Sequence, residues 1–143
     1  MPVIVVGADT GVGRAIIEGL YDPSRDIRAF VSDEEQGAEL KERGIKVALG
    51  DVSDESHIEG AAMNCFTAVL VAEASADKRE RSFAASPAEV LAGWARAVAS
   101  VTRVIWVSGG EVPDTTAPES AQVDPGDPDV VAKVVALDDA QKI

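Results

Sequence analysis

The sequence has little of several residue types that common functional sites require. Its 143 residues include one Cys and one His, which excludes an internal disulfide and leaves no His-rich metal site. No apolar run approaches the roughly 20 residues of a membrane-spanning helix, and the apolar residues 1–6 lack the basic flank of a secretory signal. We therefore expect a cytoplasmic protein, with Cys65 in its core.

Positive charge is also scarce. The chain carries 13 Lys and Arg against 25 Asp and Glu, a net charge of −12, which argues against binding to nucleic acid or to an anionic membrane. Hydrophobic residues still make up 46% of the chain, enough for a real core. The length favours one domain over residues 1–143 rather than two.

Short apolar runs alternate with amphipathic stretches along the chain, and this alternation predicts βαβ units. We expect an α/β fold, a three-layer, doubly wound, Rossmann-like parallel sheet of about five strands in the order 3-2-1-4-5. Its fifth strand would be an exposed edge, which favours a homo-oligomer or a covering segment. The predicted strands are residues 3–6, 27–31, 45–49, 66–72 and 104–107. The predicted helices are residues 11–20, 34–43, 55–63, 87–98 and 130–140.

Composition changes after the fifth predicted strand. Residues 111–129 hold four of the seven prolines and six acids, with no Lys or Arg. This composition predicts an acidic, proline-rich loop.

A glycine-rich turn lies between the first predicted strand and helix. Gly7 would allow the tight turn, Gly11 the close approach of a pyrophosphate, and Gly13 the packing of helix on strand. The helix start would present N–H groups to phosphates, and Thr10 could add a hydroxyl donor. The alternative is that these small residues serve only the architecture of a strand-to-helix turn.

Other candidate residues follow the second and third strands. Asp33 could accept hydrogen bonds from ribose hydroxyls, or Asp33 or Ser32 could simply cap a helix. Arg14 could reach a phosphate or be solvated. Asp51 could accept from an adenine amino group or only assist the next helix start. We expect His57 at the surface and Trp94 in the core.

These features, in this order, resemble the atypical short-chain dehydrogenase/reductases of the NmrA-like, NAD(P)H-binding group. The resemblance rests on the glycine turn, Asp33, residues 50–52, the strand ending at Ala72, and residues 104–108. It implies a dinucleotide cofactor, NAD or NADP, with Val12, Val52 and Ala72 among the binding residues. The turn reads Gly-x-x-x-Gly-x-Gly, as in the main short-chain branch, whereas NmrA-like proteins usually have Gly-x-x-Gly-x-x-Gly. Ser32 stands where many NADP-preferring relatives have Arg, which slightly favours NAD.

The resemblance also implies a catalytic Ser after the fifth strand and a Tyr-x-x-x-Lys motif on the following helix. Ser108 matches the Ser, and Lys133 matches the Lys, but Asp129 occupies the Tyr position. An ionised Asp cannot donate a proton near pH 7, and the one Tyr, Tyr21, lies at the end of the first predicted helix. Carbonyl reduction by the usual mechanism is therefore not expected.

Three functions remain open from the sequence. The chain could be a nucleotide-binding sensor or regulatory domain without chemistry of its own. It could instead transfer hydride from NAD(P)H to a flavin- or quinone-like acceptor that needs no Tyr, or act as an architectural remnant in partner binding. Relatives continue beyond this point to build a substrate lobe, so either the protein is naturally minimal or a partner subunit supplies the missing wall.

Overall fold

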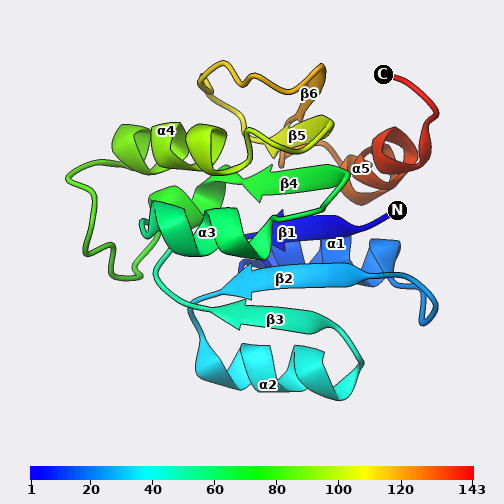
Figure 1. The fold of residues 1–143 in the computed structure, drawn as a ribbon, viewed down its shortest axis with the longest axis horizontal. Helices are drawn as coiled ribbons and strands as arrows, with labels where there is room; N and C mark the ends of the chain where they lie inside the picture. Colours follow the sequence, from blue (N-terminus) through cyan, green and yellow to red (C-terminus); the bar gives the residue numbers. More distant parts are fainter.

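The computed structural model describes all residues, 1–143, and has one six-stranded parallel sheet in the order β3-β2-β1-β4-β5-β6 (Figure 1). Every neighbouring pair of strands is parallel. The strands are β1 (Val3–Val6), β2 (Ile27–Val31), β3 (Lys46–Leu49), β4 (Thr67–Val71), β5 (Arg103–Val107) and β6 (Glu119–Val123).

Helices cover both faces of the sheet, which gives the three layers that the sequence predicts. They are α1 (Gly11–Leu20), α2 (Glu34–Glu42), α3 (Glu55–Ala61), α4 (Pro87–Ala97) and α5 (Val130–Asp139), with a short 3-10 helix η1 (Ala72–Ser75) after β4. Helices α1, α2 and α5 contribute to one hydrophobic cluster, and α3 and α4 contribute to the other. None of the helices is long and apolar enough to cross a membrane.

Alternation along each strand divides the core between the two faces. In β1, Val3 and Val5 belong to the cluster under α1, whereas Ile4 and Val6 belong to the cluster under α3 and α4. All four are fully buried, which explains why central strands of this sheet are unbroken apolar runs. The α/β Rossmann-like prediction is thus confirmed. Trp94 and Cys65 are buried and His57 is exposed, as expected.

The predicted loop over residues 111–129 is wrong in its centre, because β6 lies within it. This strand pairs in parallel with β5, so β5 is not the exposed edge that the sequence analysis expected. Glu119, Ala121 and Val123 point toward α5, while Ser120 and Gln122 are exposed on the other side. An edge strand with one covered face needs few apolar residues. β6 therefore lacks the apolar run that predicts a strand, and the acidic composition of residues 111–129 predicted a loop instead.

The connection between β5 and β6 contains no helix. It crosses the α3 and α4 side of the sheet, where Val112 and Ala117 pack against that cluster. Helix α5 then follows β6 and packs on α1, with the side chains of Val131 and Val135 over Gly19.

A fully buried cation, Arg103 on β5, joins the last elements of the fold. Its Nη1 donates to the carbonyl oxygens of Leu137, Asp138 and Ala140 at 2.7–2.9 Å. Its Nε and Nη2 donate to Glu119 Oε1 at 3.1 and 2.6 Å. The guanidinium therefore satisfies the open carbonyls at the end of α5 and pairs with β6 at the same time.

Replacing this cation should strongly destabilise the fold. In Arg103→Met the three carbonyls and the Glu119 carboxylate lose their partner, and we expect a loss of about 3–5 kcal/mol in the free energy of unfolding. Urea denaturation measures this loss. The matched control is Arg96→Met, which removes an exposed pair with Glu55 and should cost less than about 1 kcal/mol; equal costs would contradict the assignment.

Candidate functional site

The glycine turn joins β1 to α1 at the carboxyl end of the central strands. Gly7 has a φ of +85°, a left-handed conformation that favours glycine. A Cβ on Gly7 would also lie 3.1 Å from the carbonyl oxygen of Val71 on β4. A Cβ on Gly13 would lie 2.0 Å from the carbonyl oxygen of Gly7. Both glycines are therefore required by the close packing of α1 against the end of the sheet.

The hydroxyl of Thr10 is used within this turn. It donates to the Gly7 carbonyl at 2.7 Å and accepts from the Gly13 N–H at 3.0 Å, and the residue is buried. Thr10 is thus the N-cap of α1. Its hydroxyl proton already has an acceptor, so the residue contributes to the site by fixing the turn.

Gly11 differs from the other two glycines because nothing lies within 4 Å of the position of its Cβ. The backbone N–H groups of Gly11 and Val12 have no acceptor in the protein, since the helix bonds begin with the N–H of Arg14 to the carbonyl of Thr10. Two free donors and an open approach at a helix start are suited to an anion.

A hollow of about 410 Å³ lies beside this turn, at the carboxyl ends of β1 and β2. Its lining contains no apolar residue and carries three carboxylates and two cations. The lining residues are Asp9, Ser32, Asp33, Gln36, Asp77, Lys78 and Arg79.

An ion pair between Asp9 and Arg79 forms the inner wall of this hollow. The two side chains are 3% and 12% exposed, and Asp9 Oδ1 lies 2.8 Å from Arg79 Nη1. Asp77 also accepts from Arg79, at 2.8 Å. Burial lowers the pKa of Arg79, but the hydrogen bonds that its guanidinium donates to Asp77 and Asp9 outweigh this effect and raise that pKa above its usual value. The guanidinium stays charged at any physiological pH.

Asp33 is the N-cap of α2, one of the two roles left open by the sequence. Its Oδ1 accepts from the N–H groups of Glu35 and Gln36 at 2.9 and 3.1 Å. Its Oδ2 has no partner in the protein, and the residue lines the hollow, so a ribose hydroxyl could still donate to it. Arg14 instead pairs with Glu18 and Glu39 on the helix surface.

Asp51, after β3, ties down the segment between η1 and α4. Its Oδ1 accepts from Ser53, and its Oδ2 accepts from the N–H of Ser82 at 2.8 Å. Burial raises the pKa of Asp51, but these hydrogen bonds outweigh it and hold that pKa below its usual value. Val52 is buried, and its carbonyl accepts from the indole of Trp94 at 2.7 Å. Ala72 opens η1 rather than ending β4.

The candidate catalytic residues are not in contact with one another. The Ser108 hydroxyl lies at the end of β5 and accepts from the N–H of Gly110 at 3.1 Å. Lys133 is on α5 and forms an ion pair with Asp127, which raises its pKa. Asp129 is the residue before α5, and its side chain caps no N–H. Along the chain, β6 lies between Ser108 and this helix.

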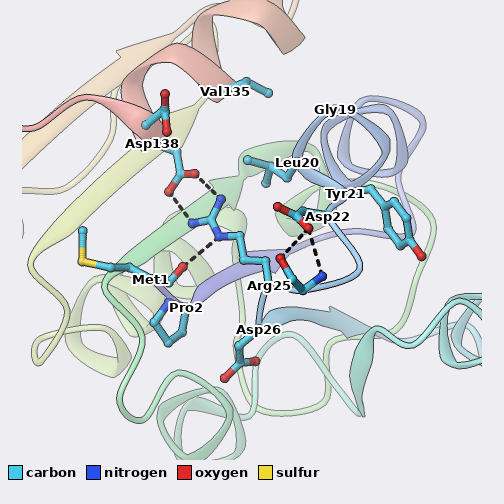
Figure 2. Close-up of a pocket in the computed structure, with 12 residues that line it drawn as sticks. Met1, Pro2, Gly19, Leu20, Tyr21, Asp22, Arg25, Asp26, Val135 and Asp138 are labelled. Atoms are coloured by element: carbon cyan, nitrogen blue, oxygen red, sulfur yellow. Dashed lines mark hydrogen bonds and ion pairs between the residues drawn. The ribbon is translucent and has the colours of Figure 1, made fainter.

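A second cavity, of about 670 Å³, lies at the opposite, amino end of the strands (Figure 2). Arg25 crosses it, with Nη1 and Nη2 on the two oxygens of Asp138 at 2.6 and 3.0 Å and Nε on the Met1 carbonyl at 2.8 Å. Its polar groups are thus largely paired within the chain. The carboxyl edge, where parallel α/β sheets bind ligands, is the better candidate.

The sequence analysis missed both Asp9 and Arg79. A carboxylate in a turn that is expected to bind a phosphate would repel that phosphate. This conflict was the one feature of the sequence that pointed to a special role for Asp9. Arg79 lies 70 residues further along the chain, in a segment with no periodic pattern, and nothing local places it at the glycine turn.

Substitution of Gly13 tests the close approach of α1 to the end of β1. Gly13→Ala should lower the free energy of unfolding by at least about 3 kcal/mol, because the added methyl group meets a backbone oxygen that cannot move aside. Gly60→Ala, on α3 with nothing within 4 Å, should be neutral or stabilising by about 0.5 kcal/mol. Urea denaturation compares the two variants, and equal behaviour would contradict the close approach.

Comparison with known proteins agrees with this geometry. A family model described as NAD(P)H-binding matches residues 7–140. A search of the curated proteins finds no match.

Solved structures with the same fold include triphenylmethane reductase from Citrobacter sp. complexed with NADP(H), at 19% identity and a TM-score of 0.61 over 76% of this chain and 37% of that one. ChuY, an anaerobillin reductase from Escherichia coli O157:H7, is 19% identical with a TM-score of 0.57, over 76% and 50% of the two chains. An NADPH-dependent quinone oxidoreductase from Escherichia coli, complexed with NADPH, is 23% identical with a TM-score of 0.59, over 74% and 36%.

The chain spans half or less of the length of these structures. The family match extends from the first glycine of the turn to the end of α5. The chain therefore belongs to the NAD(P)H-binding family that this model describes, as its resemblance to the NmrA-like short-chain dehydrogenase/reductases implies.

Proposed function

We propose that this chain binds a nicotinamide dinucleotide as a sensor or regulatory domain and does not perform Tyr-dependent carbonyl reduction. The observation that carries the proposal is the open start of α1. Gly11 leaves room for a pyrophosphate, and the N–H groups of Gly11 and Val12 have no acceptor in the protein. Dinucleotide folds hold the pyrophosphate at this position.

The remaining residues fit the adenosine half of such a ligand. The hollow beside the turn is next to Asp33, whose Oδ2 is free to accept from a ribose hydroxyl. Asp51 would position the wall rather than contact the base, since both of its oxygens already accept hydrogen bonds.

The catalytic half does not fit the usual chemistry. Lys133 is held by Asp127, at an exposed site, and Asp129 stands at the position where the resemblance expects the catalytic Tyr. Tyr21 lies at the end of α1, far from the carboxyl edge of the sheet. Its hydroxyl donates to the carbonyl of Arg43 at 3.2 Å. A binding role needs none of these groups.

A charge placed at Gly11 should weaken binding without unfolding the protein. Gly11→Asp adds a carboxylate where the pyrophosphate would lie, and we expect at least about a tenfold weaker affinity for NADH. Gly60→Asp introduces the same charge into open space on α3 and should leave that affinity unchanged. Isothermal titration calorimetry with NADH and NADPH measures both. Absence of binding by the unaltered protein at millimolar ligand would refute the proposal.

A second candidate is hydride transfer to a quinone- or flavin-like acceptor. It is favoured by the absence of a usable Tyr, because such an acceptor can take its proton from solvent. Bound NAD(P)H would supply the hydride. Ser108, Gly109 and Gly110 follow β5 at the same edge of the sheet, and nothing lies within 4 Å of the Cβ position of Gly110. A quinone oxidoreductase is among the proteins that share the fold.

Steady-state oxidation of NADH separates the two candidates. With menadione or free flavin as acceptor, the sensor role predicts no turnover above the uncatalysed rate, even when calorimetry shows that the cofactor is bound. Sustained turnover that Gly11→Asp removes and Gly60→Asp retains would establish the oxidoreductase instead.

A further inference from the structure

A set of anion-binding donors at the end of β2 is occupied by a carboxylate of the chain itself. Asp9 Oδ2 accepts from the backbone N–H of Ser32 at 2.8 Å and from that of Asp33 at 3.1 Å. Asp9 Oδ1 accepts from Arg79 Nη1 at 2.8 Å. The same Nη1 lies 3.4 Å from the hydroxyl of Ser32. Two successive amides and a guanidinium therefore converge on the Asp9 carboxylate, and the Ser32 hydroxyl accepts from that guanidinium.

This donor set has the chemistry of a phosphate site. Successive backbone N–H groups form concave anion sites, and Arg binds phosphate with charge-assisted hydrogen bonds. The position also matters, because the residues just beyond the second strand of a dinucleotide fold face the 2′ position of the adenosine ribose. A free donor set there would hold the 2′-phosphate that distinguishes NADP from NAD.

The Asp9 carboxylate removes that possibility in two ways. It fills the space between the amides and Arg79, and it is almost fully buried, so it does not move aside into solvent. It also neutralises the guanidinium, on which Asp77 makes a second pair. With Asp33 and Lys78 included, the lining of the hollow has a formal charge of −1, which repels a phosphate dianion.

We propose that Asp9 determines cofactor specificity by acting as a built-in substitute for the 2′-phosphate, so that the chain selects NAD(H) over NADP(H). The inference rests on the proposed dinucleotide function. It assigns the preference to an acid of the glycine turn and to Arg79 from the segment after β4, not to Asp33 alone.

The test compares affinities for NADH and NADPH among variants of Asp9. In Asp9→Ala the amides of Ser32 and Asp33 and the guanidinium of Arg79 become free, and the ratio of NADPH to NADH affinity should rise at least tenfold. Asp9→Asn keeps an occupant of the same shape without the charge. It should change the ratio far less than Asp9→Ala does, and equal changes in the two variants would contradict the role of Asp9 as an occupant of the donor set.

The role of Arg79 is tested by adding a second change. Asp9→Ala combined with Arg79→Met should lose most of the gained affinity for NADPH while retaining that for NADH. Asp9→Ser provides a smaller polar replacement should Asp9→Ala fail to fold, and the same rise in the ratio is expected. Urea denaturation confirms the folded state of each variant.

The outcomes separate this inference from the proposed function. If the unaltered protein binds NADH and the variants keep the same ratio of NADPH to NADH affinity, the role of Asp9 is contradicted and the proposed function stands. An unaltered protein that prefers NADPH also contradicts that role. If no dinucleotide binds, the proposed function fails. Titration with 2′-AMP and 5′-AMP still tests whether the donor set binds a 2′-phosphate. Asp9→Ala or Asp9→Ser should bind 2′-AMP more tightly than the unaltered protein does, and failure to do so refutes the inference.

Discussion

The contact between Gly13 and the carbonyl oxygen of Gly7 is the constraint on which the site depends. It brings α1 so close to the end of β1 that only a hydrogen atom fits between them. Thr10 then bridges the same carbonyl and the N–H of Gly13, which leaves the next free donors, on Gly11 and Val12, directed outward. The anion-binding character of the turn thus follows from a packing requirement and not from any charged side chain.

Three acids of this chain are used as internal acceptors around the carboxyl edge of the sheet. Asp9, Asp33 and Asp51 each accept from two or more groups within turns and helix starts. A backbone amide at a turn needs an acceptor, and a short carboxylate provides one without apolar bulk. The large negative charge of the sequence is therefore partly a consequence of the use of carboxylates as hydrogen-bond acceptors for the N–H groups of its loops. It repels polyanions at long range, while at short range these acids stabilise the turns.

The sequence was most informative where periodicity and helix starts coincide. The central strands, the glycine turn and the start of α4 at Ser86 and Pro87 were predictable, because local propensity and burial agree there. Strand β6 was not, since its exposed Ser120 and Gln122 remove the apolar signal. The pairing of Asp9 with Arg79 was not predictable either. It joins two segments that are 70 residues apart in the chain and adjacent only in the folded sheet.

The capture of the end of α5 by Arg103 has a consequence for the order of folding. This helix contains four valines among its ten residues, and β-branched residues have low helix propensity. Its carbonyls find their partner on β5, and its apolar face finds its partner on α1. We therefore expect this segment to be helical only when it is docked on the sheet. It is also the unit expected to open first, which would make hydrogen exchange in this last helix the earliest sign of a loosened sheet.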